Sequence, residues 1–364
     1  MSTAAAEYRL STPERLANFI RVVLGKVDID PADAAIVADV LVASDVRGIE
    51  SHGVARLESY YVNRLRNGEI EARPKVMTVR ETGTSILVDA GNGLGHPAAK
   101  RTMEKVIAKA REHGAAFGTV RNSNHYGIAG YYAMLGLEHD LVGMSSTNTV
   151  RLAAPTFGRE SMLGTNPFAY AIPAGEEPPF VLDFATTTVP RGKLEVYARK
   201  NEPLVRGWAI DAQGIETLDP QIALNGALLP LGGAGVDDGG HKGYGLGLLA
   251  DILCGVLSAG KFGAALPLVG AAPVAGPISH WFAAFRIDGF RDVVEFKRDM
   301  DVELRGFKNS AKAPGHERIY VAGEIEHENA LRHRADGVPV HVKVWAGLEK
   351  LAAELGVPFD IARA

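Results

Sequence analysis

Hydrophobic positions in the first 70 residues recur at the spacing of helices. Thr12-Pro13 and Asp30-Pro31 each place a side-chain oxygen before a proline, which is a typical helix start. The apolar stripe behind the second start comprises Ile36, Val37, Val40 and Leu41. We therefore predict helices that begin at Pro13 and Pro31, and a third helix that runs from a Ser51 cap to about Arg66.

The middle of the chain alternates between short apolar runs and helical patterns. The predicted strands cover 85–90, 116–122, 141–147 and 179–185, and the predicted helices between them cover 97–112 and 127–138. Further along we predict a helix at 244–258, strands at 281–287 and 318–321, and a helix at 340–355. Alternating strands and helices indicate an α/β protein. The changes in pattern divide the chain into a helical N-terminal region (1–75), an α/β domain (76–250) and C-terminal segments (251–364).

Composition and charge narrow the classes of partner. Lys and Arg total 39 and Asp and Glu total 43, so the formal net charge is −4. No block of like charge stands out, and we expect neither a nucleic-acid nor a membrane-surface partner. The single cysteine, Cys254, allows no internal disulfide and no cysteine cluster for zinc. Its apolar neighbours indicate a buried side chain.

One uncharged segment has the length of a membrane span. Residues 262–285 contain no charged side chain, but they include Pro267, Pro273, Pro277 and three glycines. That many helix breakers predict a buried or interface loop instead. The N-terminus lacks a basic region followed by an apolar core, so we expect a cytoplasmic protein.

His52, Arg56 and Tyr60 follow the Ser51 cap at i, i+4 and i+8 of the predicted third helix, and thus share one helical face. A helix N-terminus favours an anion. An imidazole that titrates near pH ~6.5 and a guanidinium that grips carboxylates suit a 2-hydroxy acid. The alternative is a solvated helix face whose histidine is satisfied by local hydrogen bonds.

Two other polar side chains follow predicted strands, where α/β sheets bind their ligands. His125 lies in Asn122-Ser123-Asn124-His125-Tyr126-Gly127, and is either a site residue or a helix cap. Asp183 ends another strand, where it either orients a histidine or a ribose or serves as a turn residue.

Two glycine-rich segments resemble phosphate-binding loops. In Gly91-Asn92-Gly93-Leu94-Gly95-His96 a histidine occupies the place of the last glycine of the Rossmann pattern, and the next strand ends in Arg121 rather than an acid. We interpret this segment as a structural turn. Gly239-Gly240-His241-Lys242-Gly243 could cradle a phosphate at a helix N-terminus, although a flexible loop explains it equally well.

Several enzyme classes lack their motifs in this chain. It contains no H-E-x-x-H, no paired-histidine metal spacing and no G-x-S-x-G. We therefore expect neither a metalloenzyme nor a serine hydrolase. The residues themselves indicate an α/β enzyme with an acid–base histidine and an anion site. A non-catalytic module that binds a carboxylate or a nucleotide is the alternative.

Seven short motifs occur in an order that resembles the type-2 malate/L-lactate dehydrogenase family. They are DVRGIESHGVARL, NSNHYG, LGTNPFAYAIP, LDFATT, RGKLEVYARK, GWAIDAQG and GGHKGYGL, and the match runs from about residue 10 to 345. This family includes sulfolactate, ureidoglycolate and diketogulonate enzymes and a cyclic-imine reductase.

The resemblance implies a non-Rossmann nicotinamide-binding α/β fold, with a mixed sheet flanked by helices and a helical N-terminal region packed against C-terminal segments. It implies a homodimer that acts on a small carboxylate such as malate or L-lactate. His52 is then the acid/base, Arg56 holds the substrate carboxylate beside Ser51 and Tyr60, and His125 lines the same pocket. Reduction of a cyclic imino acid is the alternative within the family.

The resemblance also implies a set of cofactor contacts. They are Thr165 and Asn166 near the nicotinamide, then Asp183, Phe184, Ala185, Thr186, His241, Lys242, Gly323 and Glu324. The cofactor is NAD or NADP, and we favour NAD.

Overall fold

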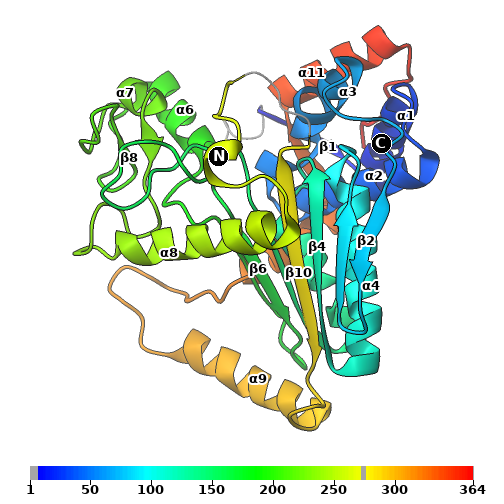
Figure 1. The fold of residues 1–364 in the computed structure, drawn as a ribbon, viewed down its shortest axis with the longest axis vertical. Helices are drawn as coiled ribbons and strands as arrows, with labels where there is room; N and C mark the ends of the chain where they lie inside the picture. The colour runs from blue at the N-terminus through cyan, green and yellow to red at the C-terminus, as the bar shows by residue number, and fades with distance from the viewer. Residues whose placement is uncertain (1–6, 272–275, 364) are drawn as a thin grey trace.

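A seven-stranded mixed sheet forms the centre of the molecule, and helices cover both of its faces (Figure 1). The computed structural model describes residues 7–271 and 276–363. In spatial order the strands are β2 (Met77–Glu81), β3 (Ser85–Asp89), β4 (Ala115–Ser123), β10 (Ile278–Arg286), β5 (Leu141–Thr147), β6 (Phe168–Ile172) and β7 (Phe180–Phe184). Only β3 and β4 pair in parallel among these neighbours. The predicted α/β class with a mixed sheet is confirmed.

The first two helices begin where the sequence predicts. The Oγ1 of Thr12 accepts the N–H of Arg15 at the start of α1 (Pro13–Gly25). The Oδ1 of Asp30 accepts the N–H of Ala32 at the start of α2 (Pro31–Val46). Each cap satisfies one of the N–H groups that a helix start leaves without an intrahelical partner.

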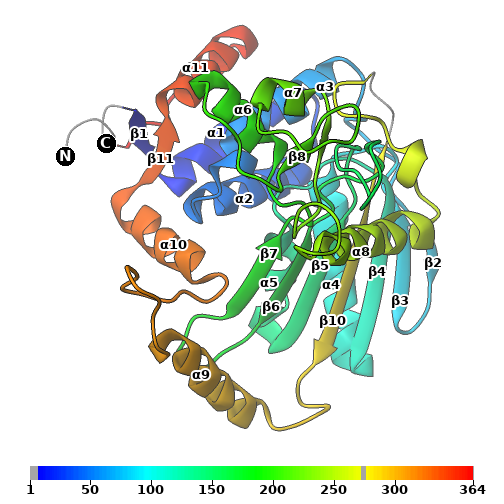
Figure 2. The ribbon, with the colours of Figure 1, turned by 90° about the vertical axis from the view of Figure 1, so that its left-hand side faces the viewer.

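The chain ends pack together. β11 (Val338–His341) pairs with β1 (Tyr8–Ser11), and α11 (Val342–Leu355) lies against the N-terminal helices (Figure 2). Their shared core includes the buried side chains of Leu16, Ile20, Leu41, Leu57, Trp345, Leu348 and Leu351. The N-terminal helical region therefore packs against C-terminal segments, as expected. The division at residues 75 and 250 stays a prediction.

Strand β10 enters the sheet from the C-terminal third of the chain and lies between β4 and β5. Trp281 faces both Thr119 and Ser146 in the register. Alternate β10 side chains point to opposite faces. Phe282 therefore joins the core beneath α4 (Gly95–His113) and α5 (Ala129–Met134), whereas Trp281 packs with Cys254 on the other face. Cys254 is buried, as predicted.

Further elements surround the sheet. A small lobe contains α6 (Arg191–Lys200), β8 (Ala209–Ile210), α7 (Pro220–Leu224) and β9 (Ala227–Leu228). α8 (Gly240–Asp251) continues as a π-helical segment, Ile252–Val256, and crosses one face of the sheet. α9 (Val293–Asn309) lies at the lower end of the sheet in Figure 1, and α10 (Glu324–Asp336) leads back to β11.

Some predicted elements were wrong. No regular helix starts at Ser51, because 3₁₀ turns cover Glu50–His52 and Val54–Arg56, and π-helical Leu57–Val62 follows before α3 (Asn63–Arg66). Residues 318–321 form no strand. Within the helix predicted at 127–138, the α-helix is limited to α5. The elements that the pattern missed are β1, β2, β6, β8, β9, β11, α6, α7, α9 and α10. The π-helical turns alter the spacing of side chains that a 3.6-residue period would place in a row.

The Gly91–Gly93 turn packs against a neighbouring segment. A Cβ at Gly91 would lie 2.8 Å from the backbone oxygen of Lys75, and one at Gly93 would lie 2.5 Å from the Cγ of Pro74. These close approaches explain both glycines without a bound phosphate.

The uncharged segment 262–285 divides into two parts. A loop with a short 3₁₀ turn, Gly263–Ala265, comes first, and the central strand β10 begins at Ile278. Pro273 lies outside the described residues. Among residues 7–271 and 276–363, no helix is both long and apolar enough to cross a membrane.

Candidate active site

His52 lies in a tight turn that is held from behind by a buried acid. The Oδ2 of Asp45 accepts the N–H of Val54 at 2.8 Å. A Cβ at Gly53 would lie 1.8 Å from the Asp45 Oδ1, so only glycine lets this turn approach α2 so closely. Burial raises the pKa of Asp45 to about 8. The turn thus has a fixed backbone beside His52.

Ser51 contacts His52 instead of capping a helix. Its Oγ lies 2.9 Å from the Nδ1 of His52, and its carbonyl accepts the Nε–H of Arg56. Burial lowers the pKa of His52 to about 4, and the positive charge of Arg56 adds to the shift. The imidazole is therefore neutral near pH 7 and able to accept a proton.

Arg56 and Tyr60 remain neighbours despite the irregular helix. The guanidinium carbon of Arg56 lies 4.6 Å from the centre of the Tyr60 ring, a cation–π distance. No carboxylate among residues 7–271 and 276–363 forms an ion pair with Arg56. The guanidinium can therefore bind a carboxylate from outside the chain.

His125 meets His52 from a different part of the chain. The two rings stack with their centres 5.5 Å apart. The Nδ1 of His125 lies 2.6 Å from the hydroxyl of Tyr61 and accepts the N–H of Gly127 at 3.4 Å. Burial and the neighbouring His52 hold the pKa of His125 well below its ordinary value. Because a backbone N–H can only donate, this neutral ring carries its proton on Nε2.

Tyr61 is a site residue that sequence reasoning missed. Its side chain is fully buried, and its ring also lies edge-on to His96 at 4.9 Å between ring centres. The only sequence signal was its place next to Tyr60, which helical spacing puts on another face. Its place in the site follows from its contact with His125, which lies 64 positions further along the chain.

A cavity of about 1020 Å³ joins these groups. The histidine side of this cavity is lined by Ser51, His52, Arg56, Tyr60, Arg64, Glu69 and His125. The Asp183 side is lined by Arg47, Thr165, Asp183, Phe184, Ala185, Arg191, Lys193, Gly323 and Glu326. The volume is sufficient for a large ligand and a small one together.

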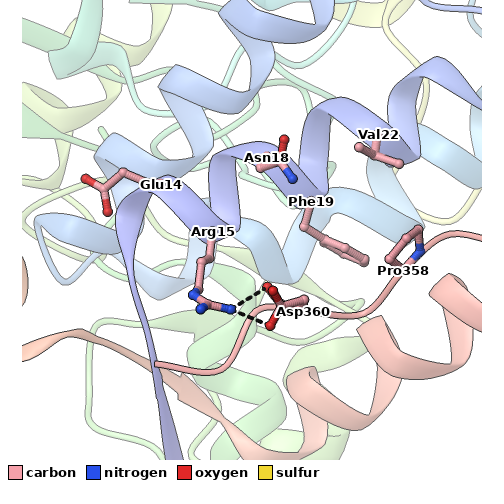
Figure 3. A pocket seen from close by; sticks show the side chains of 7 residues that line it. All are labelled: Glu14, Arg15, Asn18, Phe19, Val22, Pro358 and Asp360. Carbon is pink, nitrogen blue, oxygen red and sulfur yellow. Dashed lines mark hydrogen bonds and ion pairs between the residues drawn. The ribbon is translucent and has the colours of Figure 1, made fainter. Parts of the chain in front are cut away.

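A second, smaller pocket of about 220 Å³ lies between α1 and the C-terminal tail (Figure 3). Arg15 points across it to an ion pair with Asp360. The one cation that lines this pocket is thus paired with an acid, and we assign the pocket no chemistry.

The model of the malate/L-lactate dehydrogenase family matches residues 11–349. The chain belongs to this family. It is 43% identical to malate dehydrogenase of Pyrococcus horikoshii over 94% of this chain and 95% of that protein. It is 36% identical to L-sulfolactate dehydrogenase of Methanocaldococcus jannaschii over 96% of this chain and 98% of that protein. This dehydrogenase is thus an oxidoreductase of 2-hydroxy acids that uses a nicotinamide cofactor.

Solved structures agree with the family. Malate dehydrogenase from Entamoeba histolytica superposes with a TM-score of 0.90 at 34% identity. The superposition covers 97% of this chain and 99% of the Entamoeba chain. Malate dehydrogenase from Pyrococcus horikoshii OT3 superposes with a TM-score of 0.87 at 41% identity. The superposition covers 96% of this chain and 97% of the Pyrococcus chain.

Five of the predicted cofactor-binding residues of this dehydrogenase line the cavity, and five do not. Thr165, Asp183, Phe184, Ala185 and Gly323 line the cavity. Asn166 and Thr186 are buried: Asn166 donates to the backbone of Gly247, and Thr186 donates to that of Thr165. Glu324 binds Lys308 and Arg318, whereas His241 and Lys242 are exposed at the start of α8. These last five residues do not line the cavity, and their contact with the cofactor stays a prediction.

Asp183 presents its carboxyl group to the cavity, where the residue is still accessible to solvent. Its Oδ2 accepts the N–H of Gly130 at 2.7 Å. Burial raises the pKa of Asp183 to about 6, although the N–H of Gly130 and the positive charge of Arg47 oppose this. Near pH 7 it is mainly a carboxylate, which can accept hydrogen bonds from hydroxyl groups.

The N-terminus of α6 is a cavity feature that sequence reasoning did not assign to the site. Arg191, Gly192 and Lys193 line the cavity, and Pro190 supplies no side-chain cap. The first N–H groups of this helix and two cations therefore form an environment that suits an anion.

Proposed function

We propose that His52 exchanges a proton with the C2 oxygen of a 2-hydroxy acid, while Arg56 holds the substrate carboxylate. His125 then donates a hydrogen bond from Nε2 to the same oxygen. The observation that carries this division of roles is the backbone N–H of Gly127 on the Nδ1 of His125, because it leaves Nε2 as a donor. Among the described residues, the Nδ1 of His52 has one hydrogen-bond neighbour, the Ser51 hydroxyl, which can either accept or donate.

The cavity suits a nicotinamide dinucleotide beside the substrate. The residues that would hold it are Thr165, Asp183, Phe184, Ala185, Arg191, Lys193 and Gly323. When bound, this cofactor supplies or accepts the hydride. The carboxylates of Asp183 and Glu326 favour the ribose hydroxyls of NAD over the extra phosphate of NADP, so we propose NAD.

The activity is tested by loss of NADH absorbance with pyruvate, oxaloacetate, sulfopyruvate and a cyclic imine, each repeated with NADPH. We expect turnover of a 2-keto acid with NADH. Turnover of the cyclic imine alone would reassign the substrate class. Binding without turnover of any of the four would point to a non-catalytic module.

Two substitutions should separate the cofactor cavity from the Gly91–Gly93 turn. Asp183→Asn keeps an acceptor for the N–H of Gly130 but loses the charge, so we expect the NADH Kd to rise roughly 10-fold. Gly93→Ala forces its Cβ toward Pro74 and should lower the free energy of unfolding by about 1–3 kcal/mol. Fluorescence titration of the folded Gly93→Ala protein should give the wild-type Kd. The opposite pattern would make the glycine turn the dinucleotide site.

We further propose a homodimer that buries one face of α8 and its π-helical continuation. Leu246, Leu249, Ile252 and Val256 recur at helical spacing, and each is between 36% and 48% exposed. An apolar stripe of this kind is costly in water and marks an interaction surface. The cytoplasmic location stays a prediction.

Ile252→Glu should disrupt this dimer, because an unpaired charge is costly in an apolar interface. We expect the wild type to have about twice the 38.8 kDa chain mass in light scattering, and the variant to have the mass of one chain. Ile215→Glu, at an exposed apolar residue outside the stripe, is the matched control. A dimeric Ile252→Glu protein would place the interface elsewhere.

A further inference from the structure

We propose that Arg64 determines substrate specificity by binding a second anionic group of the 2-hydroxy acid, at the end opposite the carboxylate held by Arg56. The inference rests on the proposed roles of His52 and Arg56. It predicts that dianionic substrates, with a second carboxylate or a sulfonate, are preferred over monoanions of similar size.

Arg64 follows Arg56 and Tyr60 along the same irregular helix, and all three line the histidine side of the cavity. Burial raises the pKa of the Tyr61 hydroxyl, and the positive charges of both Arg56 and Arg64 oppose this shift. Both guanidinium groups therefore act on Tyr61, the side chain whose hydroxyl contacts His125.

The Arg64 guanidinium is fixed in place by two partners. Its Nε donates to the Oε2 of Glu69 at 3.0 Å, and one of its terminal nitrogens, Nη2, donates to the Oδ1 of Asn124 at 3.2 Å. Its other terminal nitrogen, Nη1, has no hydrogen bond to any residue in 7–271 or 276–363. A guanidinium held on two edges with a free third edge is preorganised for a ligand.

The position of Asn124 is also fixed. This residue is fully buried, and its Nδ2 donates to the backbone oxygens of Asn92 and Gly93 at 3.1 and 3.0 Å. The amide nitrogen thus points to the glycine turn, and the amide oxygen points to Arg64. Asn124 directly precedes His125, so Arg64 is hydrogen-bonded to the residue next to this site histidine.

The charged groups on the histidine side of the cavity add up to one net positive charge. Arg56 and Arg64 are cations, Glu69 is an anion, and His52 and His125 are neutral near pH 7. A monoanion neutralises this net positive charge but engages only one guanidinium. A dianion engages both, and its additional negative charge stabilises a protonated His52, the form needed to reduce a keto acid.

The test compares oxaloacetate with pyruvate in the wild type, Arg64→Gln and Arg66→Gln. Glutamine keeps an amide donor for Glu69 but removes the charge. We expect the wild type to favour oxaloacetate in kcat/KM. In Arg64→Gln the ratio of kcat/KM for oxaloacetate to that for pyruvate should fall about 10- to 100-fold, mainly through a higher KM for oxaloacetate.

Arg66→Gln is the matched control, because Arg66 pairs with Glu354 and does not line the cavity. It should keep the wild-type ratio. A second readout, the shift in melting temperature on adding malate or lactate with NAD, should show a smaller malate effect in Arg64→Gln only.

Three results would overturn the inference: wild-type preference for pyruvate, an unchanged ratio in Arg64→Gln, or an equal change in Arg66→Gln. Each of these leaves the proposed function intact, because keto acid reduction persists. If the wild type reduces no keto acid, the proposed function fails instead.

Discussion

Replacing His52 with asparagine should lower kcat about 10²- to 10⁴-fold, the usual contribution of a positioned acid–base group. Asparagine retains a polar side chain of similar size but cannot exchange a proton near neutral pH. Asp183 and the other lining residues on the Asp183 side of the cavity are unchanged, so NADH should still bind. Steady-state kinetics and a fluorescence titration of the same preparation measure both effects.

The pH profile follows from the lowered pKa of His52. When a hydroxy acid is oxidised, the neutral imidazole accepts the proton, so the rate should fall as the pH drops below its pKa. When a keto acid is reduced, the protonated imidazole donates, so the rate should fall as the pH rises above it. The free protein has a pKa of about 4 because of burial and of Arg56. A bound carboxylate offsets the charge of Arg56, so the ionisation seen in kcat should lie above that in kcat/KM.

His125→Asn is the control for this assignment. It should reduce kcat less than His52→Asn does and keep the ionisation, because His125 supplies a hydrogen bond rather than the proton. If the ionisation disappears in His125→Asn and survives in His52→Asn, the two histidines exchange roles.

Arg56→Lys should lower kcat/KM for a 2-keto acid about 10²-fold. Lysine keeps the charge but loses the planar pair of donors that grips both oxygens of a carboxylate. It also loses stacking on Tyr60, which lies 4.6 Å from the guanidinium carbon. The loss should appear in both KM and kcat, because a loosely held carboxylate leaves the C2 oxygen poorly placed for His52.

The Kd for NADH should change little in Arg56→Lys, since this residue lies on the histidine side of the cavity. Arg66→Lys, at an exposed ion pair with Glu354, should keep wild-type kinetics. Wild-type KM and kcat in Arg56→Lys would remove Arg56 from the substrate site.

Local patterns predicted some regular elements well and missed others. Thr12 and Asp30 cap their helices because a cap depends only on residues within the first turn. Strand β5 has the predicted limits, since a buried strand is a continuous apolar run. β2 is exposed along its whole length, so it has no such run and was missed. The turn at His52 was also mispredicted, because the buried carboxyl group of Asp45 holds it in a non-helical form.

The sequence by itself determined which side chains are candidates for catalysis and binding. They are His52 and Arg56, four positions apart, His125 after a strand, and Asp183 at the end of another strand. Their order along the chain and the family motifs were sufficient for the class of enzyme.

Only the tertiary structure decided how these groups work together. The contacts of Tyr61 with His125 and of Arg64 with Asn124 join positions 64 and 60 residues apart. Such contacts depend on how the N-terminal helices pack against the sheet, and no local period records that packing. The same packing encloses the half-buried rings of His52 and His125, which lowers the pKa of both, and leaves the proton of His125 on Nε2. Burial and hydrogen-bond partners set protonation, and both arise only when the chain is folded.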